Sequence, residues 1–579
     1  MTSRLLLLTL LWTSNLVAQE PSTSELALRA QTVLRTNCSR CHRGAGSEGG
    51  EFDLLKHQDL LDHDLIEPGK VDDSTLLRRI RRGEMPPKPA RLLAEEAEAI
   101  RQWIAAGAPA FNAEESARTE ISSEQTARDI LSALRAARPK DRPFLRFFSL
   151  VNLYNDPRVR DADLQVNRAA LAKTVNSLSW KSRIVVPQAI DEANTLYQID
   201  VRDFDWDRTR GWDRLMRSYP YGVEFDSTRH KELYHLHEEI HEATGCVIPV
   251  LRVDWFVATA TRPPLYYDIL QIPHVAADLE RELGVDIARN FENPTAARIS
   301  RGGFARSGVS GQNRLVERHD SKYGYYWKSY DFRADSPRGQ LVRLPLGPRN
   351  LFPAGKHPFD DLAFEHDGGE IIFSLPNGLQ AYMLIDGRDQ RIDVGPIEVV
   401  GDSLKTSGTH AIVNGVSCMS CHRHGMISFQ DTVRGHAAVF GDAEKQVERL
   451  FPPVEAMDQL LEEDETRFKT ALRRTIGEFI ASEGNRPTDA ELANYPEPVG
   501  ELARAYRLGF VDLRMAAAEI GAESPEEIIR QVGRQRMKEL GLEPLLLPGG
   551  VVPRLQWETG DGISLMQELA RDLGFTPWR

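Results

Sequence analysis

Cys38-Ser-Arg-Cys41-His42 and Cys418-Met-Ser-Cys421-His422 are the two stretches of sequence from which fold and function can be inferred. Both have the form Cys-x-x-Cys-His, which is typical of haem c attachment. Two thiols one helical turn apart can each form a thioether with a haem vinyl group, and the adjacent histidine can then bind the iron. The sequence therefore predicts two covalently bound haem c groups. The predicted attachment and axial residues are Cys38, Cys41, His42, Cys418, Cys421 and His422.

Zinc sites and disulfide frameworks also use closely spaced cysteines. A zinc site would need two neighbouring pairs, whereas these two pairs lie far apart in the sequence. Each pair is also followed directly by a histidine, which favours haem attachment over a disulfide. The chain has five cysteines, and the remaining one, Cys246, is expected to be a small buried hydrophobic residue.

A proline-rich segment downstream of His42 offers a second axial ligand for the first haem. In Gly83-Glu-Met85-Pro86-Pro87, two prolines hold an extended loop that can present the Met85 thioether to the iron. Methionine and histidine ligation raises the reduction potential and suits electron transfer. Apolar residues at helical spacing predict helices over 74–80 and 94–106, on either side of this loop. The alternative for Met85 is a methionine that fills the core.

Together these features resemble the planctomycete-type cytochrome c domain over about residues 30 to 110. The residues that carry the resemblance are Cys38 to His42, Pro68-Gly69, Ser74 to Ile80, Met85-Pro86-Pro87, Trp103-Ile104 and Gly107-Ala108. The resemblance implies an all-α cytochrome c domain in which His42 and Met85 are the axial ligands. The later run from Asn414 to His422 resembles that of di-haem cytochrome c domain-containing proteins from similar bacteria, which implies no particular substrate.

The first residues are typical of a secretory signal peptide. A short basic start ending at Arg4 precedes an apolar run over 5–12, and the small residue Ala18 marks the cleavage point. A transmembrane anchor would need about 20 apolar residues. We therefore expect residues 1–18 to be removed and the mature chain to be periplasmic or otherwise exported, without a stable membrane span.

The net charge narrows the range of partners. The formal net charge is −13 at pH 7. Nucleic-acid binding depends on clustered positive charge, so nucleic acid is not an expected partner. The haem motifs instead indicate other periplasmic redox proteins as partners.

The expected fold class is multidomain α+β, with an all-α cytochrome c domain, a mixed α/β middle region and a mostly helical C-terminal region that carries the second haem motif. The expected divisions are a signal peptide at 1–18, a cytochrome c domain at 19–112, a linker at 113–130, a mixed domain at 131–405 and a helical region at 406–579. In the middle region, alternation over 197–201 predicts a strand. The segments 370–375 and 379–385, joined by Pro376-Asn377-Gly378, predict a hairpin.

The second haem lacks an obvious methionine loop. His424 and Met426 are too close to His422 to reach the opposite face of the ring. Four residues are far enough away along the chain: His366, His410, His436 and Met457. We favour His366, which lies in the glycine-rich segment 364–369 just before the hairpin. If none of them binds, the iron is five-coordinate and has an open catalytic position.

The sequence His237-Glu238-Glu-Ile-His241 matches the zinc motif H-E-x-x-H, in which the glutamate acts as general base. The extension found in metzincins is missing, because Val247 stands where a third histidine would be. Glu280 could supply a third ligand, although nothing in the sequence marks it. The alternative is a charged helix face exposed to solvent.

Three functions follow from these motifs. The first is electron transfer in the periplasm by a di-haem c-type cytochrome. The second is a di-haem enzyme with peroxidase- or oxygenase-like chemistry at an open second haem, which the large middle region favours because a simple carrier does not need it. The third is zinc hydrolysis through His237, Glu238 and His241. We predict the first of these functions.

Overall fold

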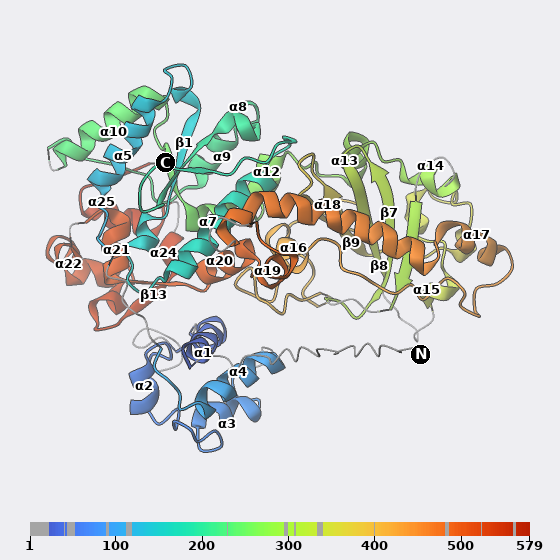
Figure 1. Cartoon of the computed structure of the whole chain (residues 1–579), viewed down its shortest axis with the longest axis horizontal. Helices are drawn as coiled ribbons and strands as arrows, with labels where there is room; N and C mark the ends of the chain where they lie inside the picture. Colours follow the sequence, from blue (N-terminus) through green and yellow to red (C-terminus); the bar gives the residue numbers. More distant parts are fainter. Residues whose placement is uncertain are drawn as a thin grey trace, which may run out of the picture. The chain divides into compact units, whose positions relative to one another are not determined.

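The computed structural model describes residues 23–39, 41–42, 52–87, 92–111, 118–228, 230–293, 299–305, 309–332, 340–398, 400–480, 486–522, 524–559 and 563–578. The chain forms two compact units, residues 1–114 and 115–579 (Figure 1). The predicted signal peptide at 1–18 lies outside the described residues. Helices and sheets both contribute to the structure, as expected for a chain of mixed α and β composition.

Helices make up the described part of the first unit. They are α1 (Thr23–Asn37), α2 (His57–Asp62), α3 (Thr75–Arg81) and α4 (Ala94–Ala105). The helices α3 and α4 confirm the two predicted around the Met85 loop. Ile100, Trp103 and Ile104 of α4 are completely buried and pack with Leu34 of α1. The indole nitrogen of Trp103 donates to the carbonyl of Pro109 at 2.8 Å, so this large side chain is buried with its polar atom satisfied.

The second unit begins with a small sheet and the helices around it. Its strands, in the order β2-β3-β1-β5, are β2 (Gln188–Ala189), β3 (Leu196–Asp200), β1 (Leu145–Ser149) and β5 (Val250–Arg252). The strand predicted over 197–201 ends at Asp200, because the Asp200 carboxylate accepts a bond from the backbone of Arg202 and starts a 3-10 turn. The predicted linker 113–130 overlaps α5 (Ser123–Ala136), whose first turn is capped by Ser122.

A six-stranded antiparallel sheet forms the other half of this unit, with the strand order β11-β10-β9-β8-β7-β6. The strands are β6 (Ile299–Phe304), β7 (Asn313–Ser321), β8 (Gly324–Phe332), β9 (Gly368–Ser374), β10 (Gln380–Asp386) and β11 (Arg391–Ile392). Strands β9 and β10 confirm the predicted hairpin. Its turn is closed by a bond from Leu375 to Leu379, and Gly378 adopts a φ of 90° that favours glycine.

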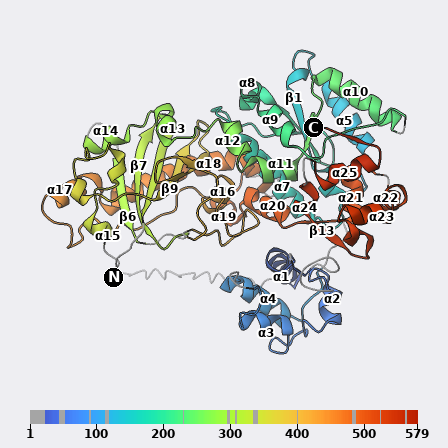
Figure 2. The same ribbon diagram turned by 180° about the vertical axis from the view of Figure 1, so that it is seen from behind.

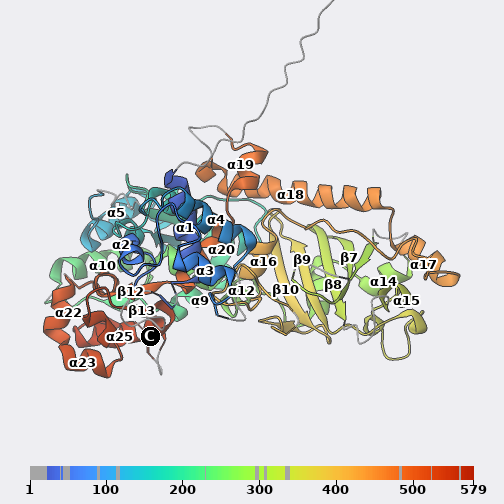
Figure 3. The same cartoon turned by 90° about the horizontal axis from the view of Figure 1, so that it is seen from below.

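Helices cover both faces of the large sheet. On one face, α13 (Ala276–Leu283) and α14 (Ile287–Glu292) lie beside β7 and β8 (Figure 2). On the other face, α18 (Val454–Ile480) crosses the strands (Figure 3). Asp464 of α18 accepts bonds at 2.8 Å from both Arg318 and Trp327 of the sheet. The helix α18 begins after Pro453 and is separate from α17 (Asp442–Leu450), because proline disrupts the interior of a helix.

The chain then adds further helices and a two-stranded sheet. The elements that matter below are α16 (Val416–Cys421), α20 (Pro498–Arg507), α21 (Leu513–Ile520) and α24 (Arg554–Glu558), together with α7 (Asp161–Ser177), α10 (Lys231–Thr244) and α11 (Val253–Ala260) from earlier in the unit. One hydrophobic core runs from Phe148 to Phe575. Residues on both sides of the predicted division at 405 therefore belong to one compact unit. In the described part of the chain, no helix has the length and apolar composition needed to cross a membrane.

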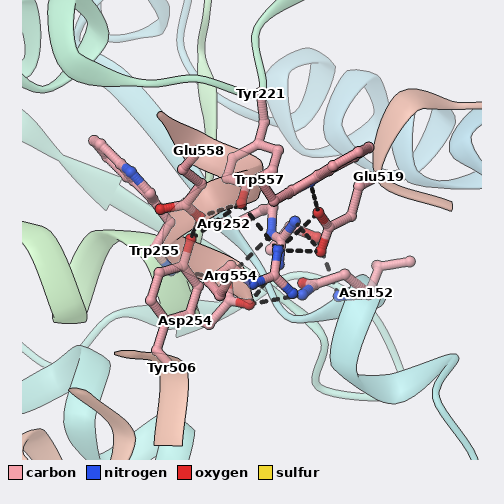
Figure 4. A network of polar contacts seen from close by, with 12 residues as sticks. Asn152, Tyr221, Arg252, Asp254, Trp255, Tyr506, Glu519, Arg554, Trp557 and Glu558 are labelled. Atoms are coloured by element: carbon pink, nitrogen blue, oxygen red, sulfur yellow. Dashed lines mark hydrogen bonds and ion pairs between the residues drawn. The ribbon is translucent and has the colours of Figure 1, made fainter. Parts of the chain in front are cut away.

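A buried network of charges joins the C-terminal helices to β5 (Figure 4). Arg252 binds Asp254 at 2.6 Å and Glu519 at 2.8 Å. Arg554 binds the same Glu519 at 2.6 Å and donates to the hydroxyl of Tyr221 at 3.0 Å. Buried charges are costly unless they are paired, and these side chains pair with one another. The network holds α21 and α24 against β5 and α11.

Candidate haem-binding sites

The second Cys-x-x-Cys-His motif lies on α16 and the residue that follows it. Cys418 and Cys421 are one helical turn apart, and His422 is the C-cap of the helix. Cys418 is only 2% exposed, and neither thiol is joined in a disulfide. The spacing therefore places two thiols and an imidazole on one short helix, as covalent haem attachment requires.

The start of α16 is fixed by the two residues that directly precede it, Asn414 and Gly415. Asn414 is completely buried; its side-chain oxygen accepts a bond from the Leu384 amide at 2.9 Å, and its side-chain nitrogen donates to the Tyr382 carbonyl at 3.2 Å. Gly415 has a φ of 82°, and a Cβ atom there would lie 2.4 Å from the carbonyl oxygen of Thr261. Glycine is therefore required at this position, and Asn414 holds the start of α16 on the backbone of β10.

The other contacts of α16 hold it from two more sides. The Ser417 hydroxyl donates to the Asp402 carboxylate at 3.2 Å. Helix α20 approaches so closely that a Cβ on Gly500 would lie 2.6 Å from the hydroxyl oxygen of Ser420. Segments far apart in the sequence thus position this motif.

The imidazole of His422 is oriented for metal binding. Its Nδ1 atom lies 3.2 Å from the carbonyl oxygen of Gly425. Because a carbonyl can only accept, Nδ1 carries a proton, and in the neutral imidazole the lone pair then lies on Nε2. Histidines that bind metals use this arrangement, with the second nitrogen held by a backbone carbonyl. This observation shows that His422 fits the role of an axial haem ligand.

The Nε2 atom of His422 faces a carboxylate. Its distance to Oε2 of Glu370 is 3.7 Å. The side chains of His422 and Glu370 are only 11% and 17% exposed, and the ring of Tyr382 lies beside the imidazole, at 6.1 Å between centroids. Burial raises the pKa of the Glu370 carboxyl, but His422 and Arg314 more than offset this effect, so its pKa lies below its ordinary value. Glu370 is therefore ionised at neutral pH.

The thiols of this motif are protonated in the protein as it stands. Burial and the nearby Glu370 carboxylate raise the pKa of the Cys418 thiol well above its ordinary value. Burial raises the pKa of Cys421 to about 12. No group of three or more His, Cys, Asp or Glu side chains in the described part of the chain is placed to hold a metal ion. The structure therefore does not support a zinc site at this motif.

The structure does not bring His366 and His422 together. The ring of His366 packs against Tyr330 of β8, and its Nε2 atom lies 3.4 Å from Asp389. Successive residues of a strand point to opposite faces of the sheet. Asp331 binds Arg314 on the face of Glu370, so its neighbour Tyr330, and His366 with it, lies on the opposite face. The sheet therefore separates the predicted ligand His366 from the second motif.

The other candidate ligands have partners of their own. The Nδ1 atom of His410 lies 3.3 Å from the carbonyl oxygen of Asp402. His436 is exposed, and its Nδ1 atom accepts from the amide of Ala438 at 3.0 Å. Met457 is buried in the core on α18. Sequence reasoning missed Glu370, whose signal was a lone charge at the start of the apolar run Glu370-Ile-Ile-Phe.

The first motif follows α1 in the other unit. Cys38 and Cys41 are half-buried, and Cys38 packs against the core that also contains Leu77 of α3. The His42 ring stacks on Phe52 with 4.8 Å between centroids. Met85 is half-buried after α3, and its amide donates to the carbonyl of Arg79 at 3.3 Å. Two thiols, an imidazole and a thioether in one small unit fit covalent haem c.

The H-E-x-x-H motif lies on α10, but its parts are not arranged for zinc. The His237 ring packs against Phe225 with 4.8 Å between centroids, and burial lowers its pKa to about 4. His241 is exposed. Glu280 accepts bonds from Tyr326 and from a buried lysine of β8. The structure gives zinc hydrolysis no support, since no metal-holding cluster is found among the described residues. Cys246 is 3% exposed, as predicted for a buried hydrophobic residue.

Comparison with known proteins bears on the first motif. Residues 38–89 match the family model described as Planctomycete cytochrome C. The first unit therefore contains a planctomycete-type cytochrome c domain, which confirms the resemblance and indicates haem-based electron transfer through covalently bound haem c. The match ends before the second motif. No curated protein and no solved structure matches the chain.

Proposed function

We propose, from the planctomycete-type cytochrome c domain at residues 38–89, that this chain is a di-haem c-type cytochrome that transfers electrons between redox proteins in the periplasm. Each haem c, when bound, supplies a one-electron couple between ferric and ferrous iron. The second haem would be held by Cys418, Cys421 and His422. The observation that carries this proposal is the orientation of His422, with Nδ1 bound to the Gly425 carbonyl and Nε2 left to bind iron.

In the first unit, Cys38 and Cys41 would hold the porphyrin covalently, while His42 and Met85 would bind the iron from its two sides. The stacking of His42 on Phe52 restricts rotation of the imidazole. Methionine is a soft ligand that favours ferrous iron, so this pair of ligands sets a high reduction potential. Such a site suits an electron carrier.

The second site also favours a carrier over an enzyme. Peroxidase- or oxygenase-like chemistry at the second haem would need an open position opposite His422, with room for a substrate. The Glu370 carboxylate faces that position at 3.7 Å from Nε2. A distal acid or base acting on a bound substrate would lie farther from the axial histidine. The di-haem enzyme therefore remains the weaker alternative.

Export of the chain is part of the proposal. Covalent haem c together with the signal-peptide pattern at 1–18 supports a periplasmic location. Periplasmic redox proteins are then the expected partners, and the acidic net charge of −13 favours partners with a basic surface.

The test is the number of haem groups per chain, counted after expression in a host that attaches haem c. We expect two haems in the wild-type protein and one in each of the double variants Cys38→Ala/Cys41→Ala and Cys418→Ala/Cys421→Ala. Cys246→Ala is the matched control and should retain two. An unchanged haem count in Cys418→Ala/Cys421→Ala would show that the second motif does not bind haem.

A further inference from the structure

The gap between His422 and Glu370 has the size of a metal-binding site with one ligand on each side. The 3.7 Å between Nε2 and Oε2 is longer than a hydrogen bond, which spans about 2.7 to 3.2 Å. It is shorter, by about 0.3 to 0.7 Å, than the sum of two bonds to a first-row metal ion, each of about 2.0 to 2.2 Å. A small movement of either side chain would give both atoms bonding distance to one ion.

The position of Glu370 in the sheet makes its carboxylate a fixed feature of the site. Glu370 lies on β9, between β8 and β10. It is paired with Leu384 of β10, and its amide donates to the Ser329 hydroxyl of β8 at 2.8 Å. Strands inside a sheet move little. The carboxylate therefore cannot leave the site without a rotamer change inside a packed core.

A cation beside Glu370 would compensate the negative charge of its carboxylate. A buried carboxylate is costly unless it is paired. The Nε2 atom of His422 lies 3.7 Å from the Glu370 carboxylate, and Nδ1 of the same ring lies 3.2 Å from the Gly425 carbonyl. Arg314 lies nearby, but its guanidinium forms two bonds with Asp331, at 2.6 and 2.7 Å. A metal ion between His422 and Glu370 would compensate the remaining negative charge.

We propose that Glu370 is the second axial ligand of the iron that His422 binds, so that the second haem has imidazole and carboxylate ligation. This inference rests on the proposed attachment of haem at Cys418 and Cys421. A carboxylate is a hard, anionic ligand and stabilises ferric iron, whereas the Met85 thioether favours ferrous iron. The second haem therefore has the lower reduction potential of the two.

The test compares wild-type protein with Glu370→Gln and Glu370→Ala, and uses Glu365→Gln as the matched control. Glu365 is an exposed carboxylate five residues earlier in the chain. Haem content, the two reduction potentials and imidazole binding to the oxidised protein are measured for each. We expect two haems in every variant. In both Glu370 variants the lower of the two reduction potentials should rise. Imidazole should bind the second haem at least about tenfold more tightly than in wild-type protein, because it no longer displaces a carboxylate. Glu365→Gln should behave like wild-type protein.

Two outcomes would overturn the inference, and they have different meanings. If the Glu370 variants keep two haems with unchanged potentials and imidazole affinity, Glu370 is not a ligand and the proposed function stands. If wild-type protein carries a single haem, the proposed function and the inference both fail. Glu370→Gln keeps the size of the side chain, so it decides the matter even where Glu370→Ala does not fold.

Discussion

A buried ion pair beneath the second haem motif offers a direct test of how this unit is held together. The Nζ atom of Lys173 on α7 lies 2.7 Å from Oε1 of Glu497, and the two side chains are 3% and 5% exposed. Glu497 also caps α20, because its carboxylate accepts bonds from the amides of Val499 and Gly500. Since α20 packs against α16, the pair links α7 to the helix that carries the motif.

Replacing Lys173 with methionine keeps the apolar stem and removes the cation. Breaking a buried pair by removing one partner costs about 3 to 5 kcal/mol, because it leaves an uncompensated charge. Two backbone amides still contact the Glu497 carboxylate, so we expect a loss near the lower end, about 3 kcal/mol. Adding Glu497→Gln removes the stranded charge while keeping an oxygen for the cap. The double variant should therefore be more stable than the sum of the single losses predicts, by about 1 to 3 kcal/mol.

The assay is urea unfolding followed by circular dichroism, with the midpoint and slope compared across the set. Lys445→Met is the matched control, because the Lys445–Asp442 pair has a similar distance of 3.0 Å but side chains that are 75% and 92% exposed. Exposed pairs contribute little, so this variant should unfold like wild-type protein. A loss below about 1 kcal/mol for Lys173→Met, or strictly additive losses in the double variant, would refute the reasoning.

Two further predictions concern a glycine and a histidine. Gly415→Ala should lower the free energy of unfolding by at least about 2 kcal/mol and reduce the content of the second haem, because Gly415 has a φ of 82° and the new Cβ would lie 2.4 Å from the carbonyl oxygen of Thr261. Gly311→Ala is the control, since a Cβ there meets nothing within 4 Å, and it should leave both the free energy of unfolding and the haem content unchanged. Burial lowers the pKa of His237 to about 4. As pH falls, this histidine is therefore protonated in the unfolded chain before it is protonated in the folded protein. The free energy of unfolding should fall, by up to about 3 kcal/mol, as pH drops from about 6.5 toward 4. The free energy of unfolding, measured across this pH range, should fall less steeply in His237→Gln than in wild-type protein or in the variant of an exposed histidine, His235→Gln. Equal pH slopes in the three proteins would contradict this prediction.

Local patterns allowed the sequence to predict the local structure. The helices around the Met85 loop follow from apolar spacing, and the β9–β10 hairpin follows from alternation around an Asn-Gly turn. Each of these depends on residues that are close together in the chain. The family of the first unit could be recognised for the same reason, since its motifs lie within residues 38–89.

The partner of His422 could not be predicted in this way. Glu370 reaches His422 only because β9 pairs with both β8 and β10 and because Asn414 holds α16 on β10. His366, only four residues earlier, had the more suitable side chain for a haem ligand. It lies on the opposite face of the sheet, and which face a residue occupies depends on strand register.

The two motifs are held in their units in different ways, and this difference bears on why the chain is large. The first lies among short helices that are close together in the sequence. The second lies on a helix of six residues, too short to be stable alone, and depends on β9, β10 and α20 for its position. In the proposed ligation, the first unit would supply the Met85 thioether from a loop, whereas the second would supply the Glu370 carboxylate from strand β9. If Glu370 binds the second iron as proposed, strand β9 gives its carboxylate a fixed position, because it is paired on both sides by β8 and β10.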